Sequence, residues 1–146
     1  MKKTILTLLM VISSVITFSQ TKIPTYKNAV GYWNKVTQKY DFEEWVFADI
    51  VFTFYDDYVS VNDKKRSIYR IVSDEPLFES ETVKINSSNC LDEENRECKV
   101  GIMQVKGDDE QTNIGVIYED NKLFMYMIDL NKLKEINSKD VKGLNK

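Results

Sequence analysis

Residues 49–61, DIVFTFYDDYVSV, alternate apolar and polar side chains on both sides of a pair of aspartates. Successive side chains of a strand point to opposite faces, so Ile50, Phe52 and Phe54 would share one buried face. Asp56-Asp57 favours a tight turn, because Asp side chains stabilise turn conformations. This stretch therefore predicts two antiparallel strands joined by a short turn.

Similar segments recur along the chain, as short runs rich in Val, Ile, Tyr and Phe between turn-forming residues. Further strands are predicted over 29–40, 66–72, 77–85, 98–106, 112–118 and 122–128. Residues 41–49 fit either an aromatic-rich connection or a short helix. After the last strand, Leu130, Leu133 and Ile136 are spaced as on one side of a short amphipathic helix.

The connections between these segments are short, which favours antiparallel hairpins over parallel crossovers. The sequence therefore predicts an all-β fold, an antiparallel meander of seven or eight strands with a short C-terminal helix. A small barrel and a two-layer sandwich both satisfy this pattern. No composition shift divides the chain, so we expect a single β domain over 21–137 and a polar tail over 138–146.

Residues 1–20 have the three parts of a secretory signal peptide. Lys2 and Lys3 precede the apolar stretch Thr4–Phe18, and Ser19-Gln20 follows it. A membrane anchor is the alternative, but the apolar stretch falls short of the roughly 20 residues that span a bilayer. We therefore expect cleavage next to Ser19 or Gln20, export to the periplasm or the exterior, and no membrane span in the mature protein.

Charge and composition exclude several classes of function. Cleavage would lower the formal charge from −3 by two, to −5, since the leader carries two lysines and no acid. An acidic chain lacks the basic surface that nucleic acid requires. The chain has no histidine, which removes His-based catalysis and His-rich metal sites. No nucleophile or cofactor motif is present, so we expect a non-catalytic protein without a cofactor.

Both cysteines flank the acidic segment NCLDEENRECKV at 89–100. A zinc site needs about four Cys or His ligands, and a redox pair normally has closer spacing. In an oxidising compartment two cysteines tend to pair. We therefore predict a structural disulfide between Cys90 and Cys98, closing a hairpin loop.

The acids between the cysteines raise the alternative of a calcium site. Asp92, Glu93 and Glu94 are adjacent, whereas an EF-hand loop spaces its ligands and contains a glycine. Arg96 can also neutralise part of the cluster. A solvated loop is the preferred interpretation, and no metal site is predicted.

Aromatic residues gather in the first third of the mature chain. Most are expected in the core, where β proteins pair aromatic side chains across strands. Trp33, Trp45 and Tyr32 are the candidates for a ligand-binding platform, and Trp45 is flanked by Glu43 and Glu44. Those two adjacent acids would point to opposite faces of a strand, so they do not form a catalytic pair.

Gly31-Tyr32-Trp33 resembles the Gly-x-Trp motif that opens lipocalins. That resemblance implies an eight-stranded barrel, a Trp that plugs its closed end and a helix after the last strand. The segments IVFTFYDDYVSV, SIYRI, CLDEENREC and IGVIYEDNKLFMYMI are similar to small exported proteins of Bacteroidota. This second resemblance implies origin and compartment but no activity.

Two functional hypotheses remain. The first is a secreted binding module for a small apolar or glycan ligand. The second is a protein–protein interaction or inhibitor domain of the cell envelope. An apolar cavity near Trp33 or Trp45 would favour the first, whereas a filled core with an exposed aromatic patch would favour the second.

Overall fold

The computed structural model describes residues 20–63, 66–106 and 112–136 of the chain. Ten strands lie within these ranges: β1 Thr21–Asn34, β2 Lys39–Phe42, β3 Val46–Phe54, β4 Tyr58–Asn62, β5 Ser67–Asp74, β6 Phe78–Glu79, β7 Val83–Leu91, β8 Glu97–Val105, β9 Thr112–Tyr118 and β10 Leu123–Ile128. Residues 1–19 of the leader and the polar tail lie outside the described residues.

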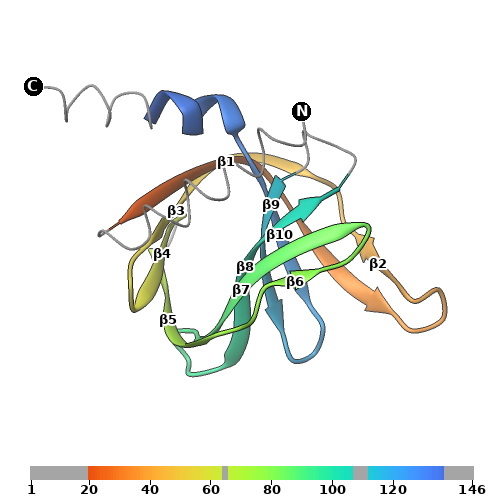
Figure 1. The fold of residues 1–146 in the computed structure, drawn as a ribbon. Helices are drawn as coiled ribbons and strands as arrows, with labels where there is room; N and C mark the ends of the chain where they lie inside the picture. Colours follow the sequence, from red (N-terminus) through yellow and green to blue (C-terminus); the bar gives the residue numbers. More distant parts are fainter. Residues whose placement is uncertain (1–19, 64–65, 107–111, 137–146) are drawn as a thin grey trace, which may run out of the picture.

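Eight of these strands close into an antiparallel barrel in the order β1-β3-β4-β5-β7-β8-β9-β10 (Figure 1). Closure comes from β1, which pairs with β3 through its first half and with β10 from Thr25 to Gly31. A register shift between Thr25 and Lys27 lets this long strand serve both partners. The predicted all-β antiparallel meander is confirmed, and its closure makes it a barrel and not a sandwich.

The barrel interior is a packed core. The alternation predicted from the sequence holds, because Phe52 of β3 is fully buried and Ile50 and Phe54 pack against the same core. The buried cluster consists of Ile23, Phe52, Val59, Val61, Cys90, Cys98, Val100, Ile102, Ile114, Val116, Ile128 and Leu133. In the described residues, large side chains therefore fill the inward positions that a ligand-carrying barrel would leave open.

The predicted C-terminal helix is confirmed over residues 130–136. Asp129 caps it, because its Oδ1 accepts a hydrogen bond from Lys132 N at 3.1 Å. Asp129 N donates to Pro24 O at 2.9 Å, which ties the start of the helix to β1. Leu133 is 1% exposed and joins the barrel core, so the apolar side of the helix packs against one end of the barrel (Figure 1).

Two predicted strands are each divided in the structure. The segment 29–40 turns after Asn34, whose Oδ1 accepts hydrogen bonds from Val36 N and Thr37 N, and Gln38 has a φ of 54°. The segment 77–85 breaks at Ser80, whose Oγ accepts from Thr82 N and Val83 N. Side chains of Asn and Ser stabilise turns in this way, so both breaks have a local cause.

Candidate functional site

A row of small residues crosses the outer face of the barrel. Ser87 of β7 lies opposite Gly101 of β8, and Gly101 lies opposite Gly115 of β9. Their neighbours Val100, Ile102, Ile114 and Val116 are buried in the core, so the small residues face outward. Three adjacent positions without bulky side chains leave a trough across the strands.

Apolar side chains form the walls of this trough. Its lining includes Ile85, Met103, Ile117, Leu123 and Met125, which come from four neighbouring strands. The volume is about 610 Å³, within the roughly 300–1,000 Å³ of small-molecule sites. We call this hollow, with its floor of Ser87, Gly101 and Gly115, the outer groove.

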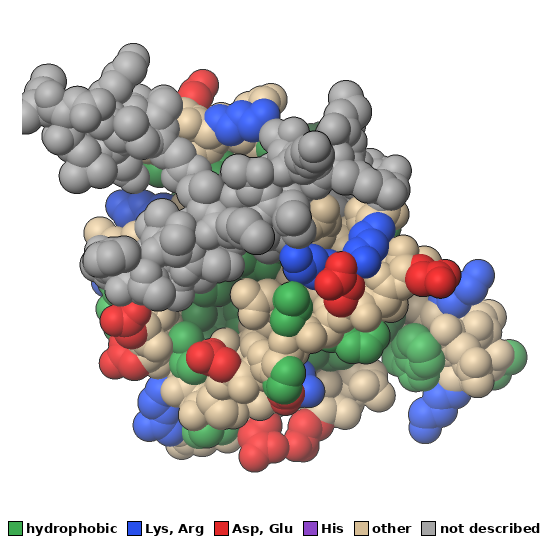
Figure 2. All heavy atoms as spheres, in the orientation of Figure 1, with side chains coloured by type: hydrophobic (Ala, Val, Ile, Leu, Met, Phe, Trp, Pro, Cys, Tyr) green, Lys and Arg blue, Asp and Glu red, His purple; other side chains and the backbone are tan. Residues whose placement is uncertain are grey.

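One rim of the outer groove is the segment from Glu75 to Phe78, which runs alongside β7. Glu75 N donates to Ser87 O at 3.0 Å, and Phe78 pairs with Ile85 through the two-residue strand β6. Leu77 and Phe78 are 53% and 55% exposed. Figure 2 shows hydrophobic side chains exposed on the face that carries β6 and, to the right, on the β1–β2 hairpin.

An aromatic row lies on the other side of the groove. Trp33, Tyr40, Phe42 and Trp45 follow one another with ring centroids 5.2, 6.2 and 6.0 Å apart. Tyr40 also lines the groove. Trp33 and Trp45, both predicted as platform residues, are therefore the two ends of this row, and neither is among the described residues that line the groove.

Tyr32 is not part of this row, because successive side chains of a strand point to opposite faces and Tyr32 therefore faces away from Trp33. It lies 46% exposed, with Lys122 Nζ 5.7 Å from its ring centroid. The role that the lipocalin resemblance implies for Trp33 is wrong. Trp33 is 40% exposed on the hairpin, because β1 continues beyond Gly31, its last pairing with β10.

A polar bridge spans the outer face beside the groove. Lys99 Nζ lies 3.3 Å from Glu75 Oε1, which also accepts a hydrogen bond from Asn89 Nδ2 at 2.9 Å. The hydrogen bonds from Asn89 and Lys99 lower the pKa of Glu75. Lys99 and Ile117 also line an adjoining hollow of about 510 Å³.

The predicted disulfide is wrong. Cys90 and Cys98 lie directly opposite each other on β7 and β8, yet both are free, buried thiols. The long β7–β8 ladder already aligns the hairpin, so its register does not depend on a covalent bond. Burial, above all, raises the pKa of Cys90 to about 11 and that of Cys98 to about 12.

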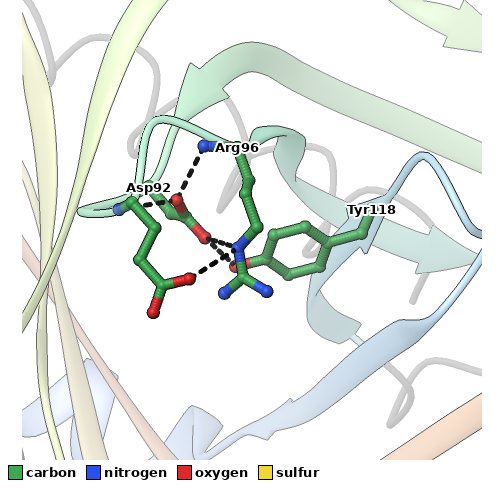
Figure 3. A network of polar contacts seen from close by, with 4 residues as sticks. Asp92, Arg96 and Tyr118 are labelled. Atoms are coloured by element: carbon green, nitrogen blue, oxygen red, sulfur yellow. Dashed lines mark hydrogen bonds and ion pairs between the residues drawn. The ribbon is translucent and has the colours of Figure 1, made fainter.

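The acidic loop is organised around Asp92 (Figure 3). Its Oδ1 accepts hydrogen bonds from the N–H groups of Glu94 and Arg96, both at 2.9 Å. Its Oδ2 accepts from Arg96 Nε at 2.9 Å and from the Tyr118 hydroxyl at 3.1 Å. Burial by itself would raise the pKa of Asp92, but these hydrogen bonds outweigh it and the pKa is lowered.

These contacts give the acidic loop a structural role. A carboxylate has about four acceptor positions, and Asp92 uses four within the protein. Glu93 Oε1 accepts from Ile68 N at 3.0 Å and ties the loop to β5. In the described part of the chain, no group of three His, Cys, Asp or Glu side chains could hold a metal ion.

Comparison with protein-family models, with curated proteins and with solved structures found no match to this chain. Within the described ranges, no helix is long and apolar enough to cross a membrane.

Sequence reasoning missed most of the groove. Gly101, Gly115, Met103 and Leu77 carried no functional prediction. A glycine inside a strand can mark a close approach by a ligand, so the two strand glycines were the available signal. Only the register of β8 against β9 places them side by side.

Proposed function

We propose that this protein is a secreted, non-catalytic binding module that holds a small apolar ligand in the outer groove. The observation that carries the proposal is the hollow of about 610 Å³ lined by aliphatic, Met and aromatic side chains. Burying an apolar ligand there would release water from both surfaces, which is favourable at about 25 cal/mol per Å². Because side chains fill the interior of the barrel, we place the ligand on its outer face.

An apolar ligand suits the groove better than a glycan. A glycan needs hydrogen-bonding groups and an open ring face. The lining offers few polar side chains, and Phe42 and Trp45 already stack on each other with an interplanar angle of 24°. Tyr40 and Trp33 meet edge to face, so these ring surfaces also contact each other.

Fluorescence of anilinonaphthalene sulfonate, a dye with an apolar ring system and one sulfonate group, tests the proposal. We expect saturable binding to the folded protein, weakened several-fold by Phe78→Ala, because that ring forms a rim of the groove. Phe47→Ala is the matched control, since Phe47 is also exposed but lies on β3 beside Lys27. Equal loss in both variants, or no binding by the wild-type protein, would contradict the proposal.

A protein partner is the second candidate, because Trp33, Phe42, Leu77 and Phe78 together expose an apolar surface. Such surfaces are common where proteins associate. In this alternative the protein is an interaction or inhibitor domain of the cell envelope. This alternative would be favoured if the wild-type protein bound no dye but co-purified with an envelope protein, and if the double variant Trp33→Ala/Phe42→Ala lost that protein.

Export is part of the proposal and rests on residues 1–20. Intact-mass measurement of protein recovered from a secreting host tests it. We expect the mature chain to begin at Gln20 or Thr21, close to the start of β1. Recovery of the uncleaved chain from the cell interior would contradict export.

A further inference from the structure

We propose that the natural ligand of the outer groove is a single long-chain carboxylate, with its alkyl chain across the strands and its head group at Lys99. This inference rests on the proposed function and adds the chemical class of the ligand. It follows from the floor of the groove, its width and its charged end.

The backbone of the floor offers no free hydrogen-bonding groups at Gly101 and Gly115, and the hydroxyl of Ser87 is its one polar side-chain group. Gly101 and Gly115 lie in strands that are paired on both sides, so their backbone N–H and C=O groups are used within the sheet. The main chain of an extended peptide lying there would lose its contacts with water and find no partner in the floor. Buried polar groups without partners cost several kcal/mol, so the floor favours a hydrocarbon.

The width of the groove fits one chain. Ile85 and Asn89 flank Ser87 on β7, four residues apart, so their Cα atoms are roughly 13 Å apart at about 3.3 Å per residue. Their side chains narrow this gap further. An α-helix, about 10–12 Å wide with its side chains, would not reach the floor.

The length of the groove also favours an extended ligand. The floor and walls cross from β7 to β10, three strand spacings of about 4.8 Å each, or about 14 Å in total. At Gly115 the floor is open: a Cβ placed there would meet only Leu123 Cδ1, at 3.5 Å. A Cβ on Gly101, by contrast, would lie 2.6 Å from Ser87 Cβ, so Ser87 covers that glycine and an unbranched alkyl chain would run over Ser87 and Gly115.

Lys99 supplies hydrogen-bond donors for an acidic head group. Among the described residues that line the groove, Lys99 is the one cation and Glu75 the one carboxylate. The Lys99 ammonium group has three N–H donors, and within the described part of the chain its ion-pair partner is Glu75. Glu75 Oε1 is contacted by both Asn89 Nδ2 and Lys99 Nζ. This contact occupies one side of the Lys99 ammonium group, so its other N–H donors can bind a ligand carboxylate.

Calorimetric titration of the full mature protein with dodecanoate tests the proposal. We expect one molecule bound per chain, and dodecanol to bind about three-fold more weakly, as for a solvent-exposed ion pair. Gly115→Val should lower the dodecanoate affinity about ten-fold or more by filling the floor. A urea midpoint close to that of the wild type would show that this variant is folded.

Lys99→Gln should remove the preference for dodecanoate over dodecanol. Lys132→Gln is the matched control, because Lys132 is also 52% exposed and lies 3.3 Å from a carboxylate, that of Asp49. The control should keep the preference, since Lys132 is on the helix at residues 130–136.

The outcomes separate the two proposals. Dye binding that depends on Phe78, without dodecanoate binding, would overturn the long-chain carboxylate and leave the apolar site intact. Equal affinity for dodecanoate and dodecanol would also contradict the proposal that the ligand has a carboxylate head group. Absence of both dye and dodecanoate binding would overturn both proposals.

Discussion

The ring of Phe42 lies over Gly31 on the adjacent strand, so closely that a Cβ on Gly31 would be 2.8 Å from Phe42 Cε1. Glycine at position 31 thus lets Phe42 cover the β1 backbone and stack on Trp45. The aromatic row beside the outer groove depends on this close approach.

Gly31→Ala should therefore displace Phe42. We expect a loss of about 1 kcal/mol in the free energy of unfolding, as for modest overpacking, and a shift in tryptophan emission. Gly115→Ala is the control, because its Cβ would make only an ordinary contact at 3.5 Å. Urea denaturation measures both, and an equal loss in the two variants would argue against the role of the Gly31–Phe42 contact.

Asp92→Asn should destabilise the protein at neutral pH by about 2 kcal/mol, because it weakens the charge-assisted hydrogen bonds from Arg96 and Tyr118. Glu94→Gln should have little effect, since the Glu94 side chain is 74% exposed. Urea midpoints of both variants at pH 7 provide the measurement. A similar loss in both would show that the Asp92 contacts add nothing specific.

The effect of Asp92 should also depend on pH. Its pKa is lowered in the folded state, so its contribution to stability is present above the unfolded pKa, near 3.8. That contribution is lost as the pH falls through the folded value. The stability gap between wild type and Asp92→Asn should therefore narrow below pH 4, and a gap that widened there would contradict the assignment.

The two cysteines should react slowly with iodoacetamide in the folded protein at pH 8. Both thiols are buried and their pKa values are raised to about 11 and 12, so little thiolate is present. After unfolding without a reductant, mass spectrometry should show two modified cysteines. A chain that remained unmodified in denaturant would instead contain a disulfide.

Leu133→Ala should lower the free energy of unfolding by about 2–4 kcal/mol, because the side chain is 1% exposed and packs into the barrel core. Lys134→Ala, at the next and exposed position of the same helix, should change it little. Chemical denaturation distinguishes the two. Similar small effects would mean that the helix is not coupled to the barrel.

The local pattern of strands, turns and helix could be predicted from the amino-acid sequence. Alternation at Ile50, Phe52 and Phe54, the turn at Asp56-Asp57 and the helical spacing of Leu130 and Leu133 all depend on near neighbours in the chain. Side-chain periodicity is a local property of strands and helices, so these predictions agree with the structure.

The arrangement of the strands relative to one another could not be predicted in this way. Three features follow from the register between strands. They are the closure of the barrel by β1 and β10, the position of the free thiols Cys90 and Cys98 opposite each other, and the row of Ser87, Gly101 and Gly115. Register is set by pairing between distant segments, and a shift of one residue would turn every side chain to the other face. The outer groove exists only because several strands place their small residues at the same level.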